Sequence, residues 1–506
     1  IRALVESVDR AGRDSAVKGL LLRVGSVDTG WARVQELREA LVRFRRSGKP
    51  SWAHLEFAGN LEYYLATGCA KVAASPTAML DVSGLAAEVT FYRGTLDKLG
   101  VEAQFEGVGK YKNAPNQFTE KGFTAPHREQ MEALVGSLFE QYVRGVAEGR
   151  GLSPEAVRSL VDRGPFPASG AKAAGLVDEL LYRDQAEGRL PASGRLDPAR
   201  YVKAGRGLFD GRPKLALVYA AGEIIPGESQ TSPFGGGLAG ADTIARGLRQ
   251  AREDGAVRAI VLRVDSPGGS GTASDAVWRE VTLARRTKPV VVSMGDYAAS
   301  GGYYIAMGAD AIVAEPGTIT GSIGVFSGKF SLRGLYGKLG ISQETVQRGK
   351  NAALFSDWAP WTDEERAKVR NLNEAFYRTF VSKAAEGRKR TPEEIEAVAQ
   401  GRVWTGEEAL AAGLVDALGG LDAAVRLARE KARIPRGEDV QLVVMPQRKG
   451  LFETLLERQD EDVLARAVEQ AFGGGRRPAA AALLRWAAAL GDGGPIARVP
   501  FELAVR

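Results

Sequence analysis

Short apolar stretches rich in β-branched residues alternate with amphipathic segments along the chain. The expected strands of its central part are residues 214–219, 257–264 and 289–293, and the expected helices are residues 241–254, 272–286 and 300–308. Strand–helix–strand alternation requires crossover connections and therefore a mostly parallel sheet. The pattern predicts an α/β fold.

The chain contains an internal duplication, because similar segments recur at an offset of 238 to 240 residues. Examples are Arg23-Val24 with Arg263-Val264, Lys49-Pro50 with Lys288-Pro289, Lys112-Asn113-Ala114 with Lys350-Asn351-Ala352, and Ala174–Asp178 with Ala412–Asp416. A fixed offset is the signature of repeated structural units. We expect a first repeat over residues 1–205 and a second over residues 206–445.

The two ends of the chain depart from this repetition. The strand expected at residues 214–219 has no counterpart in the first repeat, which suggests that the first repeat is trimmed at its N-terminus. Residues 446–506 have no counterpart either, and their Ala, Leu and Arg content predicts a helical C-terminal extension.

Composition limits the partners and cofactors that we expect for this chain. The net charge of +6 comes from scattered basic residues without a nucleic-acid-binding motif, so we expect no nucleic acid partner. The single cysteine, Cys69, excludes an internal disulfide and is expected to be a small buried residue. The two histidines, His54 and His127, are expected to be structural or surface residues, with His127 at an exposed helix start. We therefore expect no metal, and in the absence of a P-loop no nucleotide or other cofactor.

The first difference between the repeats follows matched strands. The second repeat continues with Ser266-Pro267-Gly268-Gly269-Ser270, where the first has Gly25–Gly30 without the Gly-Gly pair. Consecutive glycines leave two amides unshielded and permit positive φ, which suits an oxyanion hole. Taken alone, Pro-Gly-Gly is more often an ordinary turn.

The second difference concerns Ser300. It lies in Ala298-Ala299-Ser300-Gly301-Gly302, between an expected strand and an expected helix, and its counterpart in the first repeat is Asn60. Taken alone, Ser300 would be a helix N-cap. Because the serine and the Gly-Gly turn are present together in one repeat and absent together from the other, we interpret them as a functional unit of nucleophile and oxyanion hole.

The base that would activate Ser300 is expected to be a lysine, since burial can lower a lysine pKa enough to supply a neutral amine. Lys112 and Lys350 lie at matched positions, each followed by Asn-Ala. The residues by themselves leave the choice between them open.

These motifs resemble the bacterial signal peptide peptidase family, also called protease IV, in its long two-repeat form. The resemblance covers the chain from near residue 1 to about residue 430 and rests on four motifs. They are Ser266–Ser270, Ala298–Tyr303, Thr320–Gly324 and Gly109–Ala114. It implies two tandem Clp/crotonase-like domains.

The resemblance also implies roles for individual residues. Ser300 would be the nucleophile, Lys112 its base, and Ser322 the residue that orients the lysine amine, while Gly268 and Gly269 would hold the oxyanion. Some long-form members lack a lysine at the position of Lys350, which would here face Asn60, so Lys350 remains the alternative base.

The implied activity is a Ser/Lys endopeptidase that degrades remnant signal peptides and similar apolar segments. The family is membrane-anchored, so the resemblance implies the bacterial inner membrane, with the catalytic domains on the periplasmic or extracytoplasmic side and the anchor in a segment absent from this chain. It also implies a homo-oligomer. Two other hypotheses are a crotonase-like acyl-CoA enzyme, in which Asp296 is the nearest candidate base, and an inactive scaffold.

Overall fold

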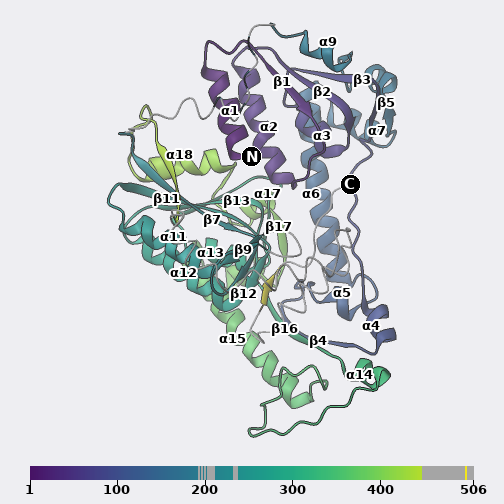
Figure 1. The fold of residues 1–506 in the computed structure, drawn as a ribbon, viewed down its shortest axis with the longest axis vertical. Coiled ribbons are helices and arrows are strands. Elements are labelled where there is room, and N and C mark those ends of the chain that lie inside the picture. The colour runs from purple at the N-terminus through teal and green to yellow at the C-terminus, as the bar shows by residue number, and fades with distance from the viewer. Residues whose placement is uncertain are drawn as a thin grey trace.

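The computed structural model describes residues 1–191, 211–231, 237–446 and 496–498, together with residues 194, 196, 198 and 201. Figure 1 shows the first repeat in the upper part of the molecule and the second repeat in its centre. The long helix α6 (Ala125–Arg150) runs alongside both. It is joined to the second repeat by side-chain hydrogen bonds such as that between Ser137 and Thr405.

The first repeat contains a small sheet whose strands follow the order β1-β2-β3-β5, with β6 also pairing with β3. The strands are β1 (Leu20–Val24), β2 (Ser51–Ala58), β3 (Lys71–Leu80), β5 (Phe166–Pro167) and β6 (Glu179–Leu180). All pairs are parallel except β3 with β5. The other described helices of this repeat are α1 (Arg2–Arg13), α2 (Trp31–Arg46), α3 (Asn60–Ala66), α4 (Arg93–Leu99), α5 (Asn116–Thr119), α7 (Pro154–Val161), α8 (Ala168–Ala173) and α9 (Arg183–Glu187).

The second repeat contains a larger sheet of the order β17-β15-β13-β11-β7-β19, to which β14 and β18 are attached. Its strands are β7 (Lys214–Ala221), β11 (Val257–Ser266), β13 (Val290–Ala299), β14 (Ala311–Ala314), β15 (Ile319–Gly321), β17 (Val403–Thr405), β18 (Ala417–Leu418) and β19 (Gln441–Met445). The described helices of the second repeat are α11 (Ala241–Glu253), α12 (Gly271–Arg285), α13 (Gly301–Ala306), α14 (Arg333–Leu339), α15 (Asp363–Arg388), α16 (Pro392–Val398), α17 (Gly406–Ala411) and α18 (Leu421–Lys431). Only the pairing of β15 with β17 is antiparallel.

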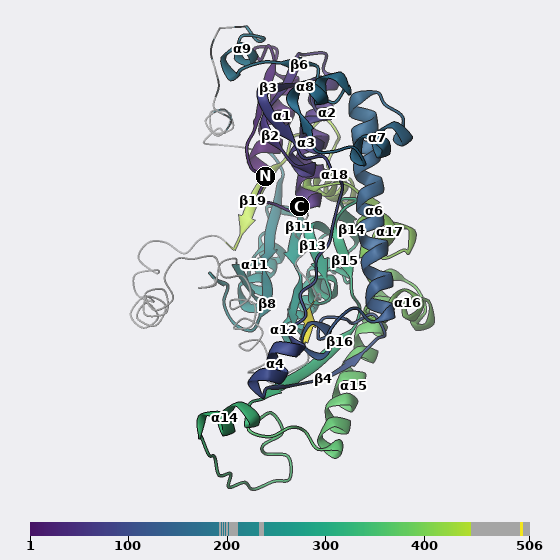
Figure 2. The same cartoon turned by 90° about the vertical axis from the view of Figure 1, so that its right-hand side faces the viewer.

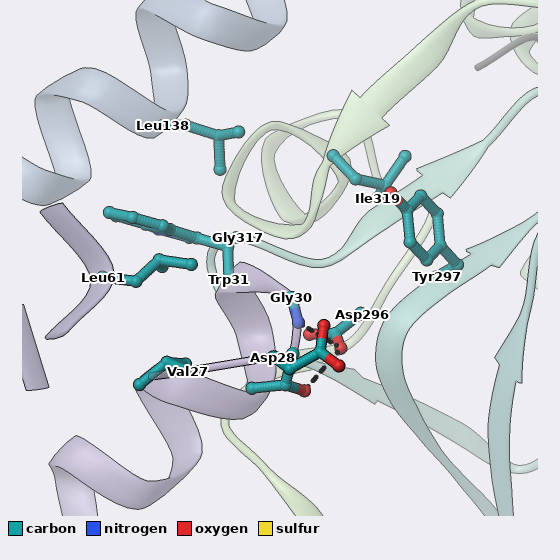
Figure 3. A pocket seen from close by; sticks show the side chains of 11 residues that line it. Val27, Asp28, Gly30, Trp31, Leu61, Leu138, Asp296, Tyr297, Gly317 and Ile319 are labelled. Carbon is teal, nitrogen blue, oxygen red and sulfur yellow. Dashed lines mark hydrogen bonds between the residues drawn. The ribbon is translucent and has the colours of Figure 1, made fainter. Parts of the chain in front are cut away.

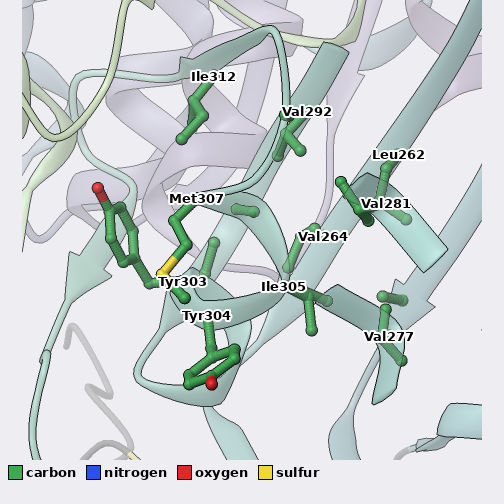
Figure 4. Packing of buried hydrophobic residues seen from close by; sticks show 14 of the residues in the cluster. Leu262, Val264, Val277, Val281, Val292, Tyr303, Tyr304, Ile305, Met307 and Ile312 are labelled. Atoms are coloured by element: carbon green, nitrogen blue, oxygen red, sulfur yellow. The ribbon is translucent and has the colours of Figure 1, made fainter. Parts of the chain in front are cut away.

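Strand β11 lies in the middle of this sheet because it is apolar on both faces. Ile260 and Leu262 pack into the main core with α11, α12 and α13, part of which Figure 4 shows. The alternate residues Ala259 and Val261 face a second core that includes α18. The two-residue period of a strand therefore places the sheet between two layers of helices.

A third sheet joins the two repeats. Its order is β4-β16-β20-β12-β8-β10-β9. The strands are β4 (Glu102–Val108), β8 (Glu223–Ile225), β9 (Gln230–Thr231), β10 (Gly237–Gly240), β12 (Gly268–Ser270), β16 (Val325–Ser331) and β20 (Ile496–Arg498). Strand β4 belongs to the first repeat but pairs antiparallel with β16 of the second. In Figures 1 and 2, β4 and the helix α4 lie beside β16, away from the sheet of the first repeat.

The strands and helices expected in the second repeat are confirmed, with ends that differ by a few residues. The duplicated α/β fold with mostly parallel sheets is also confirmed. Of the helical extension expected at residues 446–506, only Pro446 and β20 are among the described residues, and β20 is a strand. Residues 447–495 and 499–506 lie outside them, and the boundaries at 205 and 445 remain predictions.

Candidate active site

Ser300 occupies the sharp turn between β13 and α13. Its backbone has φ 55° and ψ −113°, which non-glycine residues rarely adopt. Its amide donates to the carbonyl of Gly321 at 2.7 Å, and its carbonyl accepts from the amide of Tyr304 at 2.8 Å. Because these bonds fix the turn, the Ser300 side chain is held at the end of the parallel sheet in a fully buried position.

The Lys112 ammonium group lies directly against Ser300. Its Nζ is 2.6 Å from Ser300 Oγ, 2.9 Å from Ser322 Oγ and 3.1 Å from the carbonyl oxygen of Ser322. All three are neutral oxygen atoms, and the lysine is 6% exposed. Burial holds the pKa of Lys112 well below its ordinary value. The site can therefore present a neutral amine within hydrogen-bonding distance of a serine hydroxyl.

Ser322 lies opposite Lys112 in a constrained position of its own. It is fully buried with φ 52°, and its amide donates to the carbonyl of Arg402 at 2.7 Å. Both its hydroxyl and its carbonyl face the lysine amine. This arrangement can hold the amine in one orientation.

The loop that carries Lys112 leaves the end of β4 and crosses into the second repeat. The amide of Tyr111 donates to the carbonyl of Gln400 at 2.8 Å. Gly109 has φ 105°, and a Cβ atom on it would lie 2.5 Å from the carbonyl carbon of Gln400. A Cβ atom on Gly401 would lie 2.5 Å from the amide nitrogen of Lys112. Glycine is required on both sides because the two backbones pack so closely.

The Gly-Gly turn lies in the same repeat as Ser300. Gly268 and Gly269 have φ of 110° and 151°, and the amide of Gly268 donates to Ser266 Oγ at 3.2 Å. Ser266 stands opposite Ala298 in the pairing of β11 with β13, two residues before the nucleophile position. A Cβ atom on Gly302 would lie 2.6 Å from the carbonyl oxygen of Ser266, so helix α13 packs directly on this turn.

An extended segment already lies along the glycines. Strand β20 pairs antiparallel with β12, with Gly268 opposite Arg498 and Gly269 opposite Ala497. On its other side β20 pairs with β16 through Phe326 opposite Ile496. The space between β12 and β16 therefore accommodates a chain in strand conformation.

Lys350 and Asn60, the counterparts of Lys112 and Ser300, do not meet. Lys350 has a 73% exposed side chain and forms an ion pair with Glu364, with Nζ and Oε2 2.6 Å apart. Asn60 is buried, and its Nδ2 donates to the carbonyl of Gly84 at 2.9 Å. The structure thus brings together Ser300, Lys112 and Ser322, and it does not bring Lys350 into that group.

The histidines and Asp296 are engaged elsewhere. His54 is buried, with Nε2 3.0 Å from the carbonyl oxygen of Leu181. His127 is at the start of α6 as expected, but the expectation of exposure is wrong: it is fully buried, with edge contacts to Phe91 and Phe123, and burial lowers its pKa to about 4. Asp296 accepts hydrogen bonds on both oxygens at the start of α2, so it is not the free acid that the acyl-CoA hypothesis would need.

Sequence reasoning missed the Gln400–Gly401 turn that supports Lys112. Both residues have positive φ, but only the glycine would suggest this from the sequence. A single glycine after a helix is too common to indicate a functional turn. Cys69 is buried as expected, and burial raises its pKa to about 12.

The described part of the chain contains no cluster of three or more His, Cys, Asp or Glu side chains suited to a metal ion. Within the same residues, every helix is too short or too polar to cross a bilayer.

Comparison with known proteins adds a family match. The family model for peptidase family S49 matches residues 43–195 and 282–435, one range in each repeat. "Serine protease SPPA, chloroplastic" of Arabidopsis thaliana is 36% identical over 453 residues, which cover 87% of this chain and 67% of that protein.

Two bacterial proteins are also similar. "Protease 4" of Salmonella typhi is 34% identical over 449 residues, covering 85% of this chain and 72% of that protein. "Putative signal peptide peptidase SppA" of Enterococcus faecium is 34% identical over 186 residues, covering 36% of this chain and 54% of that protein.

Proposed function

Because the chain belongs to peptidase family S49 and is a serine peptidase, we propose that it cleaves apolar peptide segments such as remnant signal peptides, with Ser300 as nucleophile and Lys112 as base. The observation that carries this proposal is the 2.6 Å contact between Lys112 Nζ and Ser300 Oγ in a buried site. A lysine in such a site is neutral at a pH at which an exposed lysine is charged.

The reaction begins when the neutral amine of Lys112 accepts the Ser300 hydroxyl proton and Oγ attacks the peptide carbonyl. The resulting ammonium group gives its proton to the leaving amine, and an acyl-enzyme remains on Ser300. Lys112 then takes a proton from water as the water oxygen attacks the ester, and returns it to Ser300 Oγ when the bond to the acyl group breaks and the acid product leaves. Ser322 keeps the amine directed at Oγ throughout, through its hydroxyl and its carbonyl.

The amides at Gly268 and Gly269 are the proposed oxyanion donors. Positive φ at both residues and the short connection to Ser300 through Ser266 and Ala298 support this assignment. In the structure the Gly268 amide donates to Ser266 Oγ, so we propose that it exchanges this partner for the oxyanion when substrate binds. Amide donors at such a position stabilise the tetrahedral intermediate as charge develops.

An extended apolar substrate fits the surroundings of Ser300. A substrate strand that took the place of β20 between β12 and β16 would gain main-chain hydrogen bonds that do not depend on sequence. The similarity to a protein named for signal peptides supports the same substrate class.

Ser300→Ala tests the proposal. We expect it to lose peptidase activity on apolar peptides and to lose labelling by a fluorophosphonate, because both need Oγ. Normal folding of the variant is checked by its thermal transition. Activity that persists in Ser300→Ala would overturn the proposal.

We also infer that the protein assembles with copies of itself through a second version of the ladder between β4 and β16. The counterpart of β4 is residues 342–348 and the counterpart of β16 is residues 85–91, by the offset of 240. Residues 342–348 are exposed, and neither segment is part of a helix or strand. Pairing of residues 342–348 from one copy with residues 85–91 of the next would give the main-chain groups of both segments hydrogen-bond partners. It would also bring Lys350 toward Asn60 of the neighbouring copy.

The proposed pairing of residues 342–348 with residues 85–91 has a defined register. Ser327 stands opposite Glu106 in the existing ladder, so Ala87 of one copy would stand opposite Val346 of the next. We expect the double variant Ala87→Cys with Val346→Cys to form intermolecular disulfides under mild oxidation, and each single variant to form none between those positions. A monomer at micromolar concentration, or equal cross-linking of the single variants, would contradict the inference.

We infer further that the protein works at a membrane, on its extracytoplasmic face. Apolar peptides left in or near a bilayer are the substrates that such a position would supply. Fractionation of cells that express the protein from its native gene tests this location, and recovery in the soluble cytosolic fraction would contradict it.

A further inference from the structure

Two aspartates of the second repeat lie just before its proposed catalytic elements. Asp265 precedes the turn that contains Gly268 and Gly269, and Asp296 lies four residues before Ser300. Their side chains are 11% and 8% exposed. The strands that carry them, β11 and β13, are parallel neighbours in the sheet, so the two carboxylates lie together at the carboxyl ends of the strands.

The first repeat binds both carboxylates through the start of helix α2. Asp296 accepts from the amides of Gly30 and Arg33 at 2.9 Å each, and Figure 3 shows the Gly30 nitrogen directed at Asp296. The Arg33 guanidinium forms a hydrogen-bonded ion pair with Asp265, and its Nε lies 3.3 Å from Asp296 Oδ2. Asp265 also accepts from the amide of Tyr297 at 3.1 Å, so the cluster links the two strand ends directly.

This cluster occurs once in the duplicated chain. The counterparts of Asp265 and Asp296 in the first repeat are Gly25 and Glu56, both exposed, and the counterpart of Arg33 in the second repeat is Ala273. An arginine present in one repeat therefore meets an aspartate present only in the other. A contact that served only to hold the sheet together would not be expected to follow the distribution of the nucleophile and the Gly-Gly turn.

The charges explain why an arginine is needed. Two carboxylates at one sheet edge repel each other, and burial and the nearby Asp296 raise the pKa of Asp265, whereas Arg33 lowers it. A guanidinium can bind both groups at once because its donors are arranged in a planar fork, which a lysine ammonium lacks. Without Arg33, repulsion would push the ends of β11 and β13 apart.

We propose that Arg33, from the repeat without the nucleophile, is a positioning residue that holds the Gly268–Gly269 turn at the correct distance from Ser300. This rests on the proposed function. The carboxylates transmit the constraint: Asp265 fixes the strand end that leads into the turn, and Asp296 fixes the strand end that leads to Ser300. The first repeat thus supplies both the proposed base and the clamp that aligns the nucleophile with its oxyanion donors.

The test compares Arg33→Met, Arg33→Lys and the double variant Arg33→Met with Asp265→Asn. We expect Arg33→Met to lower kcat and the rate of fluorophosphonate labelling by about 10- to 100-fold with KM changed less than threefold, because misplacement by about 1 Å has effects of this size. Arg33→Lys should fall between Arg33→Met and the native protein. The double variant should recover much of the lost kcat because it removes the repulsion along with the arginine.

The matched control is Arg144→Met, which removes an exposed ion pair between the repeats, Arg144 with Glu407, that includes neither Asp265 nor Asp296. It should leave kcat unchanged. If Arg33→Met does not fold, Arg33→Lys carries the test, since it keeps the positive charge and should lose kcat with a thermal transition close to native.

Two results would overturn the proposal. One is an Arg33 variant whose kcat stays within twofold of native; the other is a double variant no more active than Arg33→Met. Ser300→Ala, assayed in parallel, separates this failure from that of the proposed function. If Ser300→Ala is inactive while Arg33→Met is fully active, only the role of Arg33 is wrong, whereas an active Ser300→Ala removes the proposed function itself.

Discussion

The two repeats share one fold but differ at corresponding positions of their sites. In the second, β13 ends in a strained serine that packs against a Gly-Gly turn; in the first, β2 ends near Asn60, which binds the backbone of Gly84. The lysines reverse this difference, since Lys112 of the first repeat is buried and Lys350 of the second is exposed. Duplication has thus produced two incomplete halves, and the proposed catalytic site forms where one contributes what the other lacks.

Among the differences between the repeats, the one between Lys112 and Lys350 should have the largest effect on kcat. Lys112→Ala is expected to lower kcat by roughly 10²–10⁴-fold, as the loss of a general base does, while Lys350→Ala should stay within threefold of native. Peptide hydrolysis by both variants at one pH measures the difference. A fully active Lys112→Ala beside an inactive Lys350→Ala would reverse the assignment of the base.

A smaller effect is expected in the two matched loops. Gly268→Ala places a Cβ atom on a residue with φ 110° and should turn its amide away from the proposed oxyanion, which lowers kcat by about 100-fold. Gly25→Ala in the corresponding loop of the first repeat should have no effect, because an added Cβ atom there has no atom of the described part of the chain within 4 Å. Equal losses of kcat in both variants would contradict the assignment of the oxyanion donors.

The smallest effect concerns stability at the boundary between the repeats. Glu315 is fully buried, neither of its oxygens has a hydrogen-bond partner among the residues that the structure describes, and its counterpart in the first repeat is Ser75. Burial, followed by the nearby carboxylates of Glu39 and Glu36, raises its pKa well above the ordinary value. The folded protein therefore keeps a proton that the unfolded chain releases above about pH 4.5.

Because the folded state binds more protons in that range, stability should fall as pH rises from about 4.5 to the raised pKa of Glu315. The side chain of Glu315→Gln cannot titrate. Between pH 5 and pH 8 the melting temperature of this variant should therefore fall by a few degrees less than that of the native protein. Calorimetric melting curves of both proteins measure this. Parallel curves would show that Glu315 is ionised in the folded state.

The sequence predicted some of these features and not others, for physical reasons. Ser300 and the Gly-Gly turn could be found because both lie within one repeat, close to a strand end, and both have a counterpart that differs. The choice between Lys112 and Lys350 depends on where β4 goes in space, and neither strand pattern nor spacing specifies that pairing. The burial of His127 was missed because it depends on Phe91, which lies outside the helix.

Arg33 was invisible for a related reason. It is 232 residues from Asp265 in the sequence, and an arginine in the first turn of an amphipathic helix normally faces solvent. Only the packing of one repeat on the other gives this residue two buried partners.

The turn at Gln400–Gly401, which packs on the backbone of Lys112, has a consequence for biosynthesis. A ribosome makes the lysine first, the serine nearly 190 residues later, and this turn about 100 residues after that. An unfinished chain that has already exposed its serine still lacks the support that holds the amine in place. The proposed peptidase would therefore remain silent during its own translation, and would acquire activity only after both halves have emerged and docked.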